Sequence, residues 1–365
     1  MAGNRSSIYT DCFQVDVFQD QRMSTLLVEQ PLFSHLSSLT TSRGLYEHAE
    51  YHEARQEHGY CVDDVARAFI LLCRQPNKDL EILSFQSVYL DFLLDAIAPD
   101  GKCHNRMDTD GYWTDRPNTA DCWGRAIWAL GVGAVYGTDQ VMRARSLQGF
   151  RSLTKAMTAD RMALAFASLG AGEVLISNPH EISARHILIT AQHHLLPTEK
   201  DDNWFWPEPR LRYSNGSVAE AVLLAGWALK DMPLLDQGLR MLKFLLSMET
   251  HNEHFSLTPT GGRGPMDKKP AFDQQPLEVA ALADACARAW DFTGNPRWLH
   301  EVRRAWDWFL GDNDLGVQMF DSKTGGGYDG LTMYGPNLNQ GAESTIAMLS
   351  TAQRARQLQN FFALP

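Results

Sequence analysis

The sequence predicts an all-α fold, in which six helical hairpins form a closed toroid with an inner and an outer ring of helices. Three observations lead to this prediction. Six very apolar, Ala-rich segments recur every 40 to 65 residues or so. Six segments with apolar residues on one face alternate with them, and strand-forming patterns occur only in the loops. Helices that are apolar all round belong inside a ring, and one-sided helices can cover it.

Five of the six apolar segments share one pattern, a polar loop and an acid or amide followed by a very apolar helix, and the segment at 159–175 matches it more weakly. The six segments span residues 59–73, 118–133, 159–175, 214–229, 272–290 and 337–355. Because they are hydrophobic on nearly every side, we expect each to be buried on most sides, as an inner helix. We expect the inner helices to begin near Asp63, Asp121, Asp160, Gly216, Pro276 and Gln340.

The six one-sided segments carry charges on the face opposite their apolar stripe. They span residues 24–39, 80–97, 139–157, 181–196, 234–248 and 296–311. Each should pack on the inner ring through one face and meet solvent through the other. They are therefore predicted to form the outer ring.

Four Gly-rich, aromatic loops each follow an outer helix and precede an inner one. They are residues 99–113, 201–216, 254–269 and 319–335, and each can form a short β-hairpin. Their common position places them at one end of the toroid. No linker or low-complexity segment divides the chain, so we expect residues 1–365 to form a single domain.

Composition limits the partners and the compartment. The net charge of −11, without a cluster of Lys and Arg, argues against a nucleic-acid partner, and no apolar run is long enough for a membrane span. The six cysteines form no C-x-x-C pair and no metal-ligand spacing, and the first residues do not resemble a signal peptide. We therefore expect free thiols, a cytoplasmic protein, and neither a metal nor a cofactor. Nothing in the sequence indicates the oligomeric state.

Acidic residues gather at the starts of the predicted inner helices. They are Asp63, Asp64, Asp121, Glu220, Asp273, Glu278 and Glu343. A single acid at a helix start can simply cap the helix, but acids from several helices at the same end should converge on one funnel if the ring closes. Cleavage of a glycosidic bond requires one protonated carboxyl group and a second carboxylate. A crowded, partly buried group of acids can supply the raised pKa that the proton donor needs.

Other side chains near these acids are candidates for substrate binding or for structure. Arg67 and Arg125 follow Asp63 and Asp121 by four residues, a spacing that predicts ion pairs within each helix. His58 lies at a loop end, and His104, His251 and His254 are further loop histidines. Flat aromatic faces for sugar rings are available from Tyr60, Trp113, Trp123, Trp204, Trp206, Tyr328 and Tyr334, any of which can instead pack within its loop.

The alternating hairpins, with DDVARA at residues 63–68, GGGYDGL at 325–331 and NQGAES at 339–344, resemble the six-hairpin glycosidase superfamily. The resemblance implies an (α/α)6 toroid and a sugar substrate. Members of that superfamily include hydrolases, phosphorylases and related toroids that epimerise sugars. The paired aspartates are similar to those of some endo-mannanase-like members, which implies that Asp63 and Asp64 are the active pair.

We therefore expect a glycoside hydrolase that acts on a small oligosaccharide, with Asp63 or Asp64 working with Glu278 or Glu343 across the funnel. The predicted substrate-binding residues are His58, Tyr60, Trp113, Asp121, Trp123, Trp206, Glu220, Asp273, Tyr328, Asp329, Asn339 and Gln340.

Two alternatives stay open. One is a sugar epimerase or isomerase that uses His58 or His254, although epimerase toroids carry histidines at the inner-helix starts, where this chain carries acids. The other is a non-catalytic carbohydrate-binding accessory to a glycosyltransferase, which needs the aromatic residues but not the acids.

Overall fold

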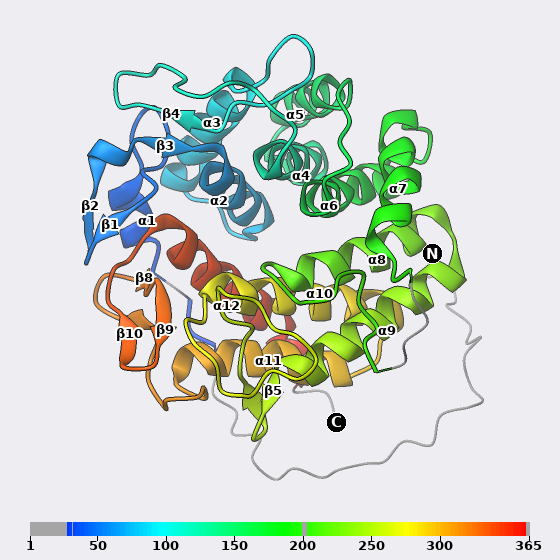
Figure 1. Cartoon of the computed structure of the whole chain (residues 1–365). Helices are drawn as coiled ribbons and strands as arrows, with labels where there is room; N and C mark the ends of the chain where they lie inside the picture. The colour runs from blue at the N-terminus through cyan, green and yellow to red at the C-terminus, as the bar shows by residue number, and fades with distance from the viewer. Residues whose placement is uncertain (1–27, 31, 199–202, 363–365) are drawn as a thin grey trace.

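Twelve α-helices alternate between two concentric rings in the computed structural model, which describes residues 28–30, 32–198 and 203–362 (Figure 1). The inner helices are α2 (Val62–Arg74), α4 (Asp121–Tyr136), α6 (Arg161–Ser177), α8 (Asn215–Leu229), α10 (Pro276–Thr293) and α12 (Ala342–Phe362). Each begins within two residues of its predicted start. The predicted all-α toroid is therefore confirmed.

The outer ring consists of α1 (Ser34–Leu39), α3 (Leu80–Asp95), α5 (Gln140–Leu153), α7 (Ile182–Leu195), α9 (Met232–Glu249) and α11 (Arg297–Leu310). Helix α1 is shorter than the predicted 24–39. Part of that segment, 24–27 and residue 31, lies outside the described residues. Among the described residues, the helix begins at Ser34.

The inner ring closes on itself, since α2 contacts both α4 and α12 and each other inner helix contacts its two neighbours. Glycines allow α4 and α6 to approach each other closely. A Cβ atom on Gly131 would lie 2.5 Å from the carbonyl oxygen of Gly170. A Cβ atom on Gly170 would lie 2.3 Å from the carbonyl oxygen of Ile127. A single hydrophobic core runs from Val28 to Leu358 through both rings.

Short antiparallel strand pairs lie in the loops, as predicted, but not in all four of the predicted places. The described part of 201–216 contains no strand pair, and the hairpin expected within 254–269 lies instead at Thr250–Phe255. The strand pairs are β1 (Ala49–Glu50) with β2 (Glu53–Ala54), β3 (Tyr60–Cys61) with β4 (Arg106–Met107), β5 (Thr250–His251) with β6 (His254–Phe255), β7 (Phe320–Asp321) with β8 (Gly326–Gly327), and β9 (Gly330–Thr332) with β10 (Gly335–Asn337). A 3-10 turn, Gln56–His58, precedes β3. The loops that connect an outer to the next inner helix all lie at the end where the inner helices begin, which we call the mouth.

A buried ion-pair network fills the axis deeper in the ring. Arg288 of α10 contacts Glu173 of α6 and Glu220 of α8, the latter at 3.3 Å. Asp284 pairs with Arg354 at 2.6 Å, and with Arg74 at 3.1 Å. These charges join five inner helices below the mouth, so the axis is closed by paired ions rather than by an apolar plug.

Five cysteines, Cys61, Cys73, Cys103, Cys122 and Cys286, are buried free thiols, while Cys12 lies outside the described residues. Within the described part of the chain, no helix combines the length and the hydrophobicity that crossing a bilayer requires.

Candidate active site

A polar cavity of about 480 Å³ opens at the mouth of the inner ring. It is lined by Glu47, His48, Cys61, Asp63, Asp64, Arg67, Arg106, Asp121, Arg125, Tyr213, Gln275, Asp329, Asn337, Gly341, Glu343 and Ser344. Carboxylates from the first turns of α2, α4 and α12 are among them. The expected convergence of acids from three inner helices is therefore present.

The turn before α2 positions the paired aspartates. Gly59 has a φ of 67°, and a Cβ atom there would lie 2.2 Å from the carbonyl oxygen of Met107. Only glycine fits this conformation at this distance, so β3 can pair with β4 directly before the helix. The backbone N–H of Val62 then donates to Asn105 at 2.9 Å, and α2 begins with both aspartates in its first turn.

The two aspartates point in different directions, because neighbours on a helix are about 100° apart. Asp64 is buried; it accepts from Arg67 at 2.6 Å and from the Cys61 thiol at 3.2 Å. Asp63 forms an ion pair with Arg125 at 3.0 Å and accepts from the amide of Asn105 at 3.0 Å. Asp63 is the more exposed of the two, with 22% of its side chain accessible against 4% for Asp64.

Arg67 and Arg125 pair differently from the prediction, which placed Asp63 with Arg67 and Asp121 with Arg125. Arg67 bridges Asp64 and Glu343, at 2.6 Å each, and Arg125 reaches Asp63 on the neighbouring helix. The i,i+4 prediction was wrong because the closed ring offers each long guanidinium a carboxylate on another helix. The two arginines thereby connect α2 with α12 and α4 with α2.

Charge and burial set the proton affinity of these groups. Burial raises the pKa of Asp64 to about 6, against the opposing effect of Arg67. Burial opposes the charge on Arg67, but Glu343 and Asp64 together raise its pKa. Arg67 thus keeps its positive charge between two acids.

Asp121 differs from the other acids of the cavity. No hydrogen bond reaches its carboxylate from the residues that the structure describes, although Arg125 lies near enough to act on it electrostatically. Burial raises the pKa of Asp121 to about 6, and Arg125 opposes this effect. Asp121 can therefore carry a proton near neutral pH and direct it into the cavity.

Glu343 and Asp329 form the side of the cavity at the start of α12. The side chain of Glu343 is 33% exposed, and its carboxylate forms an ion pair with Arg67. Asp329 accepts from the backbone N–H of Gly341 at 2.8 Å, and burial raises its pKa. Asp329 thereby fixes the loop that leads into the helix.

Three predicted acids lie outside the cavity lining. Glu278 is buried and accepts from the backbone of Ser214 and Asn215, and burial raises its pKa to about 8. Glu220 belongs to the ion-pair network with Arg288. Asp273 is exposed in the loop before α10. Glu220 and Glu278 sit one turn into their helices, on faces directed toward neighbouring helices.

The predicted aromatic platforms are mostly core residues. Tyr60 is buried and stacks on Tyr46; Trp123 is fully buried, with its indole N–H donated to the backbone of Leu153. Trp206 is 4% exposed. Trp113 stacks on His104 and donates to Asp95 at 3.0 Å. Tyr328 is partly buried and also outside the lining.

The remaining predicted residues surround the cavity without lining it. His58 contacts His48 edge to face, with ring centroids 4.9 Å apart. The amide oxygen of Asn339 accepts from the backbone of Tyr51 at 2.9 Å. Gln340 is buried and accepts from the hydroxyl of Thr324 at 2.7 Å. All three therefore hold the loops around the mouth.

Several lining residues were absent from the predicted set. Tyr213 lies two residues before α8 and Gln275 directly before α10, so their position before an inner helix was an available signal. Glu47, His48 and Arg106 come from loops before α2 and α4, where no periodic pattern marks them. Glu47 pairs with Arg106 across the cavity edge.

One group in the lining has the composition of a metal site. Glu47, Cys61 and Asp64 offer ligand atoms within 4.8 Å of one another. Burial raises the pKa of the Cys61 thiol well above its ordinary value, so the thiolate that a metal requires is disfavoured. Arg106 and Arg67 already pair with the two acids. This group therefore fits charge pairing better than metal binding.

A narrower space of about 60 Å³ continues from the cavity along the ring axis and shares Arg67, Arg125 and Glu343 with it. Below these residues its walls are largely apolar, including Ile70 and Trp128. The site is thus a funnel, wide and polar at the mouth and narrow toward the ion-pair network.

Comparison with known proteins shows which solved structures are similar to this one. No protein-family model and no curated sequence matches the chain. Among solved structures, a sugar epimerase from a ruminal bacterium is similar at a TM-score of 0.70 and 13% identity, covering 90% of this chain and 97% of that one. A cellobiose 2-epimerase from Bacillus thermoamylovorans matches at 0.67 and 11% identity, covering 90% and 96%.

A third similar structure is the GH76 α-mannanase of Bacteroides thetaiotaomicron, at a TM-score of 0.63 and 12% identity, covering 90% of this chain and 94% of that one. At such low identities the likeness is one of fold. These structures therefore confirm the (α/α)6 toroid fold that the resemblance implied.

Proposed function

We propose that the protein is a carbohydrate-active enzyme that hydrolyses a glycosidic bond of a small oligosaccharide in the mouth cavity. The observation that carries the proposal is the convergence of carboxylates from α2, α4 and α12 on one polar cavity, with one of them, Asp121, able to hold a proton. The sugar-processing enzymes among the similar structures support a sugar as substrate.

Asp121 is the proton donor in this proposal. A general acid must be protonated near the working pH and free to point at the leaving oxygen. The raised pKa of Asp121 meets the first condition, and its lack of a hydrogen-bond partner among the described residues meets the second. Asp64 has a similar pKa, but its oxygens are taken by Arg67 and Cys61.

Glu343 is the second carboxylate, which activates water or attacks the anomeric carbon. Its helix, α12, is separated from α4 in the ring by α2, so Asp121 and Glu343 approach a bound sugar from different sides. Hydrolysis requires acid and base on opposite sides of the scissile bond. Arg67 forms an ion pair with the Glu343 carboxylate, and 33% of the Glu343 side chain stays accessible.

The remaining lining residues supply substrate binding. Asp63, Asp329 and Gln275 offer hydrogen-bonding groups for sugar hydroxyls, and Tyr213 offers an aromatic face. In this assignment Asp63 holds the sugar between the two catalytic carboxylates. Glu278, which the sequence suggested as a partner, is left out because the backbone of Ser214 and Asn215 occupies it.

A second candidate, sugar epimerisation or isomerisation, rests on His48. It is the histidine among the lining residues, whereas neither His58 nor His254 lines the cavity. Burial lowers the pKa of His48, which favours the neutral imidazole that could remove a proton from a sugar carbon. The epimerases among the similar structures make this the main alternative.

The test is a panel of oligosaccharides incubated with the purified protein, with products separated by chromatography and reducing ends quantified. Hydrolysis predicts new reducing ends and shorter products. Asp121→Asn and Glu343→Gln should each lower turnover by about 10²–10⁴-fold. Asp236→Asn, an exposed acid on outer helix α9, is the matched control and should keep normal turnover.

Two outcomes would contradict hydrolysis. Conversion of a sugar to an isomer of the same mass, lost in His48→Gln but kept in Asp121→Asn, would favour epimerisation. Saturable binding without any product, unaffected by both amide variants, would favour a binding module.

A further inference from the structure

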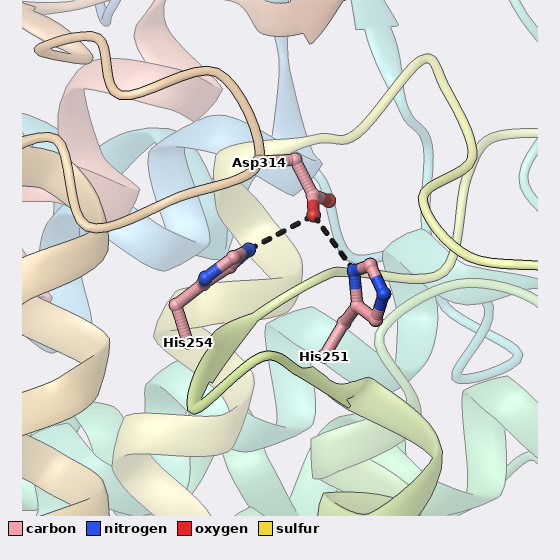
Figure 2. A group of neighbouring side chains, drawn as sticks. All are labelled: His251, His254 and Asp314. Carbon is pink, nitrogen blue, oxygen red and sulfur yellow. Dashed lines mark hydrogen bonds and ion pairs between the residues drawn. The ribbon is translucent and has the colours of Figure 1, made fainter.

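Two imidazoles and one carboxylate meet outside the cavity lining, where the β5–β6 hairpin approaches the loop after α11 (Figure 2). His251 ends β5, His254 begins β6, and Asp314 lies in the loop that follows α11. One ring nitrogen of each histidine and an oxygen of Asp314 lie within 4.8 Å of one another. We call these three residues the His251–His254–Asp314 cluster.

The spacing within the cluster is that of ligands around one metal ion. Asp314 Oδ1 lies 2.9 Å from His254 Nε2 and 3.6 Å from His251 Nδ1. A tetrahedral ion with bonds of about 2.0–2.1 Å to nitrogen and oxygen keeps its ligand atoms about 3.3 Å apart. The two measured distances lie on either side of this value, so small side-chain movements would complete the geometry.

The surroundings of Asp314 orient its carboxylate as a metal ligand would be oriented. Its side chain is 1% exposed, and its second oxygen, Oδ2, accepts from the amide of Gln274 at 2.7 Å. Oδ1 therefore points at both imidazoles, as Figure 2 shows. A hydrogen bond to the second oxygen of a carboxylate ligand is the usual way in which proteins orient it toward a metal.

His251 supplies an independent indication. Its Nδ1 is buried and has no hydrogen-bond partner among the residues that the structure describes, because 3.6 Å to Asp314 is too long for a hydrogen bond. A buried ring nitrogen without a partner is unfavourable, and a bound cation would satisfy it. The ring itself is 32% exposed, so the cluster is open to solvent on this side.

We propose that the His251–His254–Asp314 cluster binds a divalent transition-metal ion, in first place Zn²⁺, with water in the remaining position. Two imidazoles and a carboxylate suit Zn²⁺, whereas Mg²⁺ and Ca²⁺ prefer oxygen ligands only. The ion would tie the β5–β6 hairpin to the loop after α11 and, through Gln274, to the segment that carries Gln275 into the cavity. The spacing of residues in the sequence does not predict this site, because Asp314 lies 60 residues after His254.

The role of the ion is to order loops at the mouth, not to take part in the reaction. The proposal is independent of the proposed hydrolysis, since neither histidine nor Asp314 lines the cavity. Zinc binding can therefore be measured without a substrate.

The experiment is a Zn²⁺ titration of the chelator-treated full chain in competition with a chromophoric zinc indicator. One Zn²⁺ per chain should bind with a dissociation constant at or below about 1 μM. His251→Ala and Asp314→Asn should each weaken binding by about tenfold or more. His300→Ala, an exposed histidine elsewhere, should bind as the parent does. Zn²⁺ should raise the melting temperature of the parent by a few degrees, but not that of the cluster variants.

Circular dichroism of the metal-free proteins checks that the variants fold, and His251→Gln replaces the alanine variant if that one does not. Absence of stoichiometric binding to the parent would overturn the proposal. Equal affinity of the parent and of the folded cluster variants would overturn it as well, since the bound ion would then lie elsewhere.

Discussion

Arg67 holds two acids of the cavity, and removing its charge tests how the site is stabilised. In Arg67→Met the side chain keeps its length, but Asp64 and Glu343 lose the guanidinium that contacts both at 2.6 Å. Asp64 is 4% exposed, so its carboxylate cannot turn to bulk water, whereas Glu343 is 33% exposed and can do so in part. The damage should therefore come mainly from Asp64.

The size of the effect follows from this burial. Removing one partner of a buried ion pair costs about 3–5 kcal/mol, and the exposure of Glu343 places the expected loss of unfolding free energy near the lower end, about 3 kcal/mol at neutral pH. Without Arg67, the pKa of Asp64 rises further above its present value of about 6. The folded variant then binds a proton that the unfolded chain has already released.

A raised folded-state pKa gives stability at low pH that is lost as the pH rises through it. The unfolding free energy of Arg67→Met should therefore fall between about pH 5.5 and about pH 7.5, by at most about 1.4 kcal/mol per pH unit. Urea denaturation of parent and variant at both pH values measures this. Arg145→Met is the matched control, because Arg145 and Asp91 also pair at 2.7 Å but with 43% and 59% exposed side chains. It should cost less than about 1 kcal/mol. Equal losses for the two variants, without the pH dependence, would refute the reasoning.

Three further predictions concern packing, substrate binding and pH. Gly170→Ala places a Cβ atom 2.3 Å from the carbonyl oxygen of Ile127, and should lower the unfolding free energy by about 1–3 kcal/mol in urea denaturation; Gly261→Ala, with no atom within 4 Å, should change it little. Tyr213→Ala removes the aromatic face of the cavity and should raise KM about tenfold in steady-state kinetics; an unchanged KM would exclude this contact. The kcat/KM of the parent should fall as the pH rises above about 6, because Asp121 then loses its proton. A profile that is flat between about pH 5 and about pH 8 would contradict that assignment.

The fold was largely predictable because two kinds of helix alternate along the chain. Segments such as 214–229 are apolar on every side, and only an inner ring buries them. The inner-helix starts follow from the same pattern; that of α4, at Asp121, was predicted to the residue.

The cavity was only partly predictable, and the reason is helical phase. A helix that is apolar all round gives no sign of which face meets the axis. Glu220 and Glu278 therefore looked equivalent to Glu343, although they face neighbouring helices. Trp123 was predicted to stack on a sugar ring, but its indole is buried in the core, where its N–H donates to the backbone carbonyl of Leu153. Glu47 and His48 come from an irregular loop, where no periodicity exists to be read.

The ion pairs that Arg67 and Arg125 form between helices could not be predicted from the sequence either. Spacing shows which partners lie within one helix, as for Arg67 and Asp64, but it does not show that Arg67 also pairs with Glu343 and that Arg125 pairs with Asp63, each on a neighbouring helix. Only closure of the ring brings the first turns of α2, α4 and α12 together.

The most direct test of the proposed function is a crystal structure of the Asp121→Asn variant with an oligosaccharide that the parent cleaves. The amide removes the proton donor with little change of shape, so the substrate should remain intact in the cavity. We predict that the glycosidic oxygen lies about 2.6–3.2 Å from the side chain of residue 121, with Glu343 on the opposite side of the scissile bond. A sugar bound outside this cavity, or one whose scissile bond lies beyond the reach of both residues, would contradict the assignment.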